Sequence, residues 1–347
     1  SSTQTPSSAA SDVYKRQGVN KTGTSSLQFA CSENQEVLSE SGVLYPTMGR
    51  GYSAHHGIPF EIHRDQKRKH QADRWGELDA DWVEVLEGMA VGHDSVVLSS
   101  EAFHALGNPE RVANAFSGHH VSVVVYLREH FGYIRSWYQQ DVQGNVVTCA
   151  LSDFPGVKKA AFCPVLDEWA AVFGKENVYP RVFDSSKLIG GDIVTDFFSI
   201  APLPQVDLDD FSSKEVHKNL SVSGNLLFFK RVANHILTRD EAVGVADELG
   251  AMTVLDESFQ GAIAVDQAVA EKIRGIYQED RRRLEEKYDL RFSDLKWSPN
   301  GHQCPNPDRL ARDWELVVAE MERTDKKLLG YIKQRFPDLD LFFKCFS

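Results

Sequence analysis

The first residues along the chain that could do chemistry lie in the glycine-bearing segment Gly18–Gln28, whose sequence is GVNKTGTSSLQ. Lys21 supplies an ammonium group, and Thr24, Ser25 and Ser26 supply hydroxyls directly before the apolar positions that begin a helix. At such a turn, unpaired backbone N–H groups and the positive end of the helix dipole point at one spot. Together these groups predict a binding site for an anion such as a phosphate.

The order of residues in this segment differs from the Walker A loop. In that loop the lysine follows the second glycine, and a serine or threonine after the lysine holds magnesium. Here Lys21 precedes Gly23. A kinase-like phosphotransferase would need the missing hydroxyl and a second acidic residue at a strand end, and the sequence shows neither convincingly. An ordinary turn that caps a helix, with an incidental lysine, is the other interpretation of the segment taken alone.

A second polar group follows the most apolar strand of the chain. Arg128 ends the run Val121–Leu127, and Ser136 comes eight positions later in a predicted helix. A guanidinium can bind a phosphate through two parallel hydrogen bonds, and a hydroxyl can add another donor. Taken alone, the pair is more simply a strand-end arginine that meets a surface carboxylate and an exposed helical serine.

Together, the two motifs resemble the 5′-phosphosulfate loop and the 3′-phosphate motif of sulfotransferases that use 3′-phosphoadenosine 5′-phosphosulfate (PAPS). Weaker matches to downstream segments of bacterial-type and carbohydrate sulfotransferases are Gly190–Phe198 and Asn219–Ser221. The resemblance covers residues 18 to 292. It departs from the family in a first strand that looks truncated, with only Gly18 and Val19 before the loop, and in Leu27, where some members have tryptophan.

The resemblance implies in-line transfer of a sulfuryl group from PAPS to an acceptor hydroxyl, with no metal. It implies that Lys21 lies beside the bridging oxygen, and that the 5′-phosphate is held by Lys21, Thr22, Gly23, Thr24, Ser25 and Ser26. Arg128 and Ser136 would hold the 3′-phosphate. The acceptor would be a carbohydrate, a small alcohol or a phenol, and the sequence does not say which. A catalytically inactive relative that binds a nucleotide or a protein partner is the alternative.

A general base must take the proton of the acceptor. Glu101 follows the short apolar strand Val96–Leu98, and some branches of the resembled family use a glutamate. His55 and His56 have the more suitable unperturbed pKa. We expect Glu101 to be the base, with His56 as the second candidate. The alternatives are a carboxylate that stabilises a helix start, for Glu101, and ordinary loop residues, for the histidines.

Helices that alternate with short buried strands predict an α/β fold, namely a P-loop-like parallel sheet flanked by helices, with a largely helical C-terminal part. The predicted strands are 96–98, 121–127 and 178–183, the last at an edge because of Pro180, and 43–46 is a short apolar piece stopped by a proline. Ligands gather at the carboxyl edge of such sheets, so residues 18–26, Ser99–Glu101 and Arg128 should share that edge. We further expect a disordered, artefactual tail at 1–17, one domain at 18–297, and a linker and helix at 298–347 packed on it.

The composition narrows the function further. With 42% hydrophobic and 25% charged residues, the chain has the make-up of an ordinary soluble protein. Its net charge of -12 argues against a nucleic-acid partner, which needs a basic face. The five cysteines lack metal-ligand spacing, and no apolar run approaches the ~18 residues of a membrane span. The location stays open between the cytoplasm and, if an N-terminal anchor is missing, the Golgi lumen; the oligomeric state stays open too.

Overall fold

The computed structural model of the chain describes residues 12–18 (backbone alone), 23–66, 78–212, 222–261, 263, 265–293 and 305–335. Contacts between residues divide the chain into two compact units. The first consists of Ser1–Glu129, Phe162–His217 and Asp280–Ser293, and the second consists of His130–Ala161, Lys218–Glu279 and Asp294–Ser347. This division differs from the single domain expected over residues 18–297.

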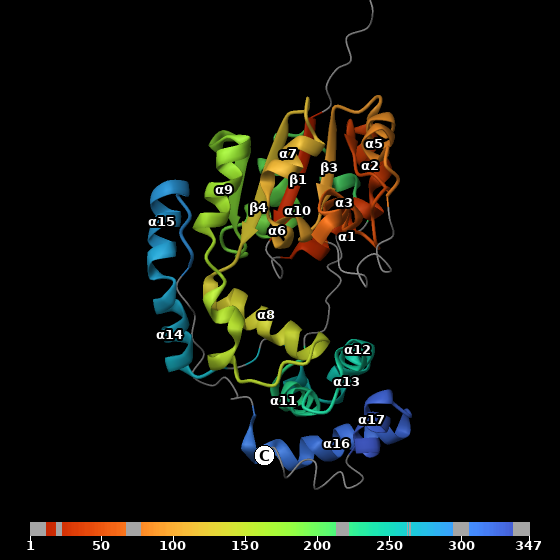
Figure 1. Cartoon of the computed structure of the whole chain (residues 1–347), viewed down its shortest axis with the longest axis vertical. Helices are drawn as coiled ribbons and strands as arrows, with labels where there is room; N and C mark the ends of the chain where they lie inside the picture. The colour runs from red at the N-terminus through yellow and green to blue at the C-terminus, as the bar shows by residue number, and fades with distance from the viewer. Residues whose placement is uncertain are drawn as a thin grey trace, which may run out of the picture. The chain divides into compact units, whose positions relative to one another are not determined.

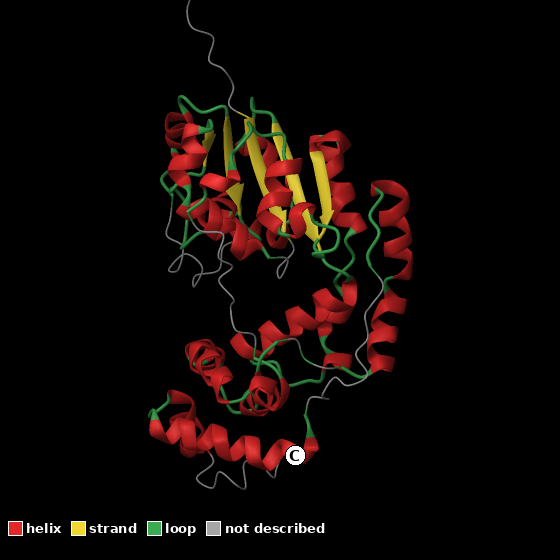
Figure 2. Cartoon of the chain, turned by 180° about the vertical axis from the view of Figure 1, so that it is seen from behind, coloured by secondary structure: helices red, strands yellow, loops and turns green. Residues whose placement is uncertain are grey.

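The first unit is built on a parallel sheet of five strands in the order β2-β3-β1-β4-β5 (Figures 1 and 2). The strands are β1 (Asp12–Gly18), β2 (Val43–Leu44), β3 (Ser95–Ser99), β4 (Val121–Leu127) and β5 (Val178–Val182). Every side chain of β3 and β4 is buried. A parallel sheet with both faces covered requires such strands, and the proline-bearing β5 lies at the edge, as predicted.

Strand β1 corrects the expectation of a disordered tail for residues 12–17, whereas residues 1–11 lie outside the described residues. Residues 12–17 form most of this strand, which pairs with β3 on one side and with β4 on the other. The strand also has seven residues, instead of the truncated start expected from the sequence. The physical reason is that the facing edges of β3 and β4 carry backbone donors and acceptors, and a strand between them satisfies both sets.

Helices cover both faces of the sheet (Figure 2). Leu27 and Cys31 belong to a buried cluster on one face that also contains Val124 of β4. The neighbouring residue Val125 is buried as well and points to the opposite face, because side chains alternate along a strand. The helices of this unit are α1 (Thr24–Glu33), α2 (Gln35–Glu40), α3 (Gly57–Ile62), α5 (Trp82–Ala90), α6 (Ala102–Leu106), α7 (Pro109–Ala115), α9 (Cys163–Phe173), α10 (Ile193–Ile200) and most of α15 (Gln278–Tyr288).

The second unit is helical throughout its described residues and contains no strand there. This agrees with the predicted helical C-terminal part. Its helices are α8 (His130–Gly144), α11 (Gly224–Ala233), α12 (Arg239–Gly244), α13 (Ala246–Met252), α14 (Gln267–Ile276), α16 (Leu310–Arg323) and α17 (Lys327–Arg335).

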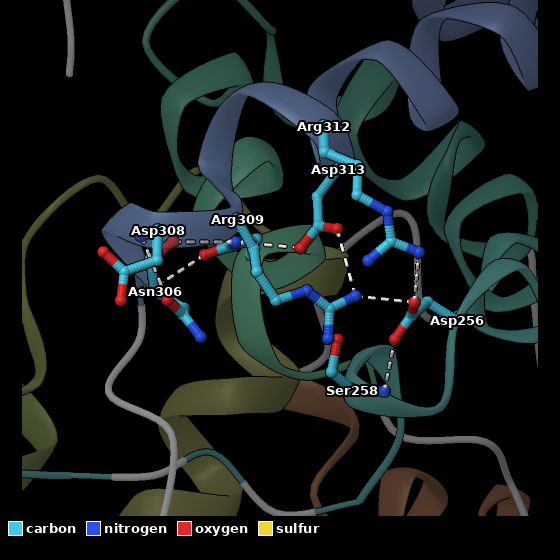
Figure 3. Close-up of polar contacts among 8 residues, drawn as sticks. Asp256, Ser258, Asn306, Asp308, Arg309, Arg312 and Asp313 are labelled. Atoms are coloured by element: carbon cyan, nitrogen blue, oxygen red, sulfur yellow. Dashed lines mark hydrogen bonds and ion pairs between the residues drawn. The ribbon is translucent and has the colours of Figure 1, made fainter.

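A charged cluster attaches helix α16 to its neighbours in this second unit (Figure 3). Arg309, at the start of α16, donates to Asp256 at 2.6 Å and to Asp313 at 3.2 Å. Asp313 is buried and also accepts a hydrogen bond of 2.9 Å from Asn225 of α11. The cluster therefore fixes the start of α16 against both α11 and the turn at residue 256.

Over the described ranges, no helix combines the length and the apolar character that crossing a membrane requires.

Candidate active site

Helix α1 begins at a glycine that no other residue could replace without strain. Gly23 has φ 66° and ψ 17°, in the left-handed region. A Cβ atom at this position would lie 2.5 Å from Cε2 of Phe183, the residue after β5. Thr24 is the first residue of the helix and is buried, whereas Ser25 is exposed and Ser26 is half-buried. Of the residues expected to hold a phosphate, Gly23, Thr24, Ser25 and Ser26 thus form the tight start of a helix that follows β1.

Glu101 lies beside this helix start, as expected from its place after β3. Its Oε1 accepts a hydrogen bond of 2.9 Å from the hydroxyl of Thr24. Its Oε2 lies 3.5 Å from the amide nitrogen of Gln28, one turn further along α1. The side chain is 20% exposed, so the carboxylate is reachable from solvent. A negative charge at this place also interacts favourably with the positive end of the helix dipole.

His56 faces the same carboxylate. Its Nε2 is 3.8 Å from Oε2 of Glu101, and its Nδ1 is 2.7 Å from the hydroxyl oxygen of Ser100. The Ser100 oxygen already accepts a hydrogen bond from the backbone N–H of Ala102, at 3.1 Å. Its own hydrogen can therefore go to Nδ1 of His56, which leaves the imidazole with its N–H on Nε2, directed at Glu101.

His55, by contrast, is a structural residue. It is fully buried, its Nε2 donates to the carbonyl of Pro46, and its Nδ1 accepts from the backbone N–H of Ser99 at 3.1 Å. Burial lowers the pKa of His55 to about 4, so the ring stays neutral at physiological pH. Of the two adjacent histidines, only His56 has a place beside Glu101.

Arg128 follows the last residue of β4 and is half-buried. Among the residues that the structure describes, its guanidinium forms no hydrogen bond and no salt bridge. Burial lowers the pKa of Arg128 from its usual value, and the neighbouring charge of Glu129 acts in the opposite direction. A partly desolvated cation with no such partner is suited to an anionic ligand. Ser136 lies in α8, in the second unit, and its pairing with Arg128 remains a prediction.

The topology of the sheet agrees with a ligand site at this edge. After β1 the chain passes to β2 on one side, and after β4 it passes to β5 on the other. In parallel α/β sheets, ligands bind at the carboxyl edge where successive connections diverge in this way. Thr24, Glu101 and Arg128 follow three neighbouring strands at that edge.

Some predicted site residues lie outside the described residues, namely Lys21, Thr22 and the matched segment Asn219–Ser221. In the other matched segment, Asp192 accepts hydrogen bonds from the first turn of α10. Asp196 is buried there and binds Arg181 and the hydroxyl of Tyr126. This network holds α10 against the ends of β4 and β5, next to Phe183.

One residue of the site, Gln28, was not predicted. It follows Thr24 by four positions, a spacing that places both side chains on the same face of a helix and could have indicated Gln28 as a neighbour of Glu101. Ser100 was expected at this edge, because it directly precedes Glu101. The sequence could not have shown that Ser100 binds His56, because 44 positions separate the two residues.

No family model matches the sequence, and a search of curated proteins finds no match. Among solved structures, a sulfotransferase from Alicyclobacillus acidocaldarius is similar to this chain with a TM-score of 0.45. The sequence identity is 14%, and the likeness covers 82% of this chain and 98% of the other. A likeness of this degree carries no argument about fold or function, which therefore depend on the residues of this chain.

Proposed function

We propose that the protein is a sulfotransferase that moves a sulfuryl group from PAPS to the hydroxyl of a carbohydrate, a small alcohol or a phenol. The observation that carries the proposal is the contact between Thr24 and Glu101. It places a solvent-accessible carboxylate directly beside a helix start suited to phosphate. Transfer between an anionic donor and a hydroxyl acceptor needs these two functions side by side: one holds the donor and the other takes the proton.

In the proposed reaction, the oxygen of the acceptor forms a bond to sulfur while the bond between sulfur and the bridging oxygen of the 5′-phosphate breaks. Glu101 takes the proton of the acceptor hydroxyl, and His56 directs an N–H at that carboxylate. The products are the sulfate ester and adenosine 3′,5′-bisphosphate. The start of α1, together with Lys21, would stabilise the charge that develops on the leaving oxygen. Arg128, with Ser136, would bind the 3′-phosphate.

A thermal-shift titration tests the proposed donor. Adenosine 3′,5′-bisphosphate at a hundredfold excess over its Kd should stabilise the protein by about 2.7 kcal/mol, whereas ATP with magnesium should not. Stabilisation by ATP with magnesium alone would favour a kinase-like phosphotransferase. No stabilisation by either nucleotide would favour an inactive relative with an interaction role.

Two arginine variants make this titration specific. Arg128→Gln should weaken binding of the bisphosphate by roughly tenfold or more, because it removes a charge-assisted hydrogen bond worth about 1.5–3 kcal/mol. Arg282→Gln is the matched control, since Arg282 is an exposed arginine of α15 that pairs with Glu286. Equal affinities for the two variants would remove Arg128 from the site. Incubation with labelled PAPS and a panel of sugars, phenols and alcohols would then identify the acceptor.

A further inference from the structure

The hydroxyl of Thr24 has one hydrogen, and in this structure that hydrogen is directed at Glu101. Thr24 is only 4% exposed, and its oxygen lies 2.9 Å from Oε1 of the carboxylate. An ionised carboxylate can only accept hydrogen bonds, so Thr24 must be the donor. The phosphate oxygens of a nucleotide likewise need donors from the protein. Thr24 can therefore serve Glu101 or a phosphate at the start of α1, but not both.

The carboxylate of Glu101 also occupies an electrostatic position that suits an anionic ligand. It contacts Thr24 and Gln28, the first and fifth residues of α1, and thus lies beside the positive end of the helix dipole. A phosphate that approaches the same helix start would meet the negative charge of Glu101 at short range. The two anions compete both for the hydroxyl and for the dipole.

Building on the proposed function, we propose that Glu101 acts as an internal substitute for the donor phosphate, and that binding of the donor releases it for catalysis. When a phosphate takes the hydroxyl of Thr24, Oε1 of Glu101 no longer accepts from that hydroxyl and can accept from the hydroxyl of the acceptor instead. The base is thereby activated only when the donor is present. Thr24 and Gln28 are positioning residues in this scheme, because they act on the reaction through Glu101.

The scheme predicts an effect on affinity that a merely structural glutamate would not produce. Glu101→Gln should bind adenosine 3′,5′-bisphosphate about tenfold more tightly than the wild type, because it removes a like charge at the helix start. The same variant should transfer sulfuryl groups slowly, because the base is gone. Tighter binding combined with slower transfer separates competition with the ligand from simple damage to the site.

The experiment is isothermal titration of the full chain with adenosine 3′,5′-bisphosphate. Glu33→Gln is the matched control, because Glu33 is exposed at the opposite end of α1 and its loss changes the net charge equally. Thr24→Val should bind more weakly than the wild type, and Thr24→Ser, which keeps a hydroxyl, should bind more tightly than Thr24→Val. The gain in affinity from Glu101→Gln should be smaller when Thr24 is also replaced by valine, because the double variant has no hydroxyl for which Glu101 and the phosphate compete.

The outcomes distinguish the two proposals. If the wild type binds no bisphosphate, the proposed function and the scheme built on it both fail. If the wild type binds it, but Glu101→Gln binds no more tightly than Glu33→Gln while circular dichroism shows a folded protein, the scheme alone is wrong.

Discussion

The start of α1 depends on one glycine, and the substitution Gly23→Ala tests that dependence. The backbone at this residue is left-handed, with φ 66°. The added methyl group would lie 2.5 Å from Cε2 and 2.6 Å from Cζ of Phe183. The substitution therefore introduces two separate penalties, one from the backbone conformation and one from the collision with the ring.

The two penalties can be estimated separately. A left-handed conformation costs an alanine about 1–2 kcal/mol. Forcing a methyl group into an occupied space costs about 1–3 kcal/mol more, because the half-buried ring of Phe183 must move. We therefore expect Gly23→Ala to lower the free energy of unfolding by about 2–5 kcal/mol. It should also weaken binding of adenosine 3′,5′-bisphosphate, because Gly23 sets the direction of the first turn of α1.

Gly92 supplies the control for this measurement. It has φ +89°, and a Cβ atom at this position would meet no atom within 4 Å. Gly92→Ala therefore carries the backbone penalty without the collision. Urea unfolding of both variants should show a larger loss for Gly23→Ala, and only that variant should bind the bisphosphate less well. Equal losses with unchanged affinity would refute the close fit between Gly23 and Phe183 as a determinant of the site.

Two further predictions concern charged groups of the second unit. Burial lowers the pKa of the fully buried Lys230 from 10.5 to about 7. Below pH 7 this shift lowers the free energy of unfolding by roughly 5 kcal/mol. Lys230→Met should therefore raise the free energy of unfolding at pH 6. This gain should decline towards pH 10, because the wild type becomes more stable as Lys230 loses its proton in the unfolded state too. Urea unfolding that shows the same difference between variant and wild type at pH 6 and pH 9.5 would contradict this. Burial raises the pKa of Asp256, but hydrogen bonds from Ser258 and Arg309 outweigh it and lower the pKa to about 2. Asp256→Asn should therefore remove about 2 kcal/mol of stability at pH 7. In the wild type the same stability should be lost as pH falls from about 4 to about 2, a trend that unfolding curves of the variant should lack.

The sequence predicted the part of the fold that depends on local pattern. The apolar run Val121–Leu127 is a strand with the same bounds in the structure, because a strand buried on both faces leaves no alternation to misread. The position of Glu101 after β3 and of Arg128 after β4 followed from the strand ends alone. The strand ends therefore predicted that Thr24 and Glu101 lie at the same edge of the sheet. They did not predict the roles of the two residues.

Other features depend on partners that are distant in sequence. Residues 12–18 contain Asp12, Lys15 and Arg16 and lack an apolar run, so nothing local marks β1 as the central strand. Arg283 donates to Asp167 at 3.0 Å, across 116 positions of sequence. Such contacts form only after the elements have packed, and no periodicity encodes them.

The adjacent histidines show the same limit within one site. His55 and His56 have the same side chain and neighbouring positions, yet one is a buried structural residue and the other faces Glu101. The difference arises because His55 accepts from the N–H of Ser99 at the end of β3. Once that bond fixes the backbone, the next side chain lies beside Ser100 and Glu101. The sequence could name the pair but not choose between its members.

A carboxylate at the helix start also bears on selectivity in a chain whose net charge is -12. An open helix start attracts any small anion, because its N–H groups and dipole do not distinguish phosphate from other oxyanions. Under the proposed scheme, Glu101 offsets this attraction, so that an incoming anion must displace it from Thr24. A ligand that also reaches Arg128 gains a second charged contact with which to do so. A small anion at the helix start lacks that contact. Competition with Glu101 would thus favour a ligand with two phosphates over the simple anions that surround it.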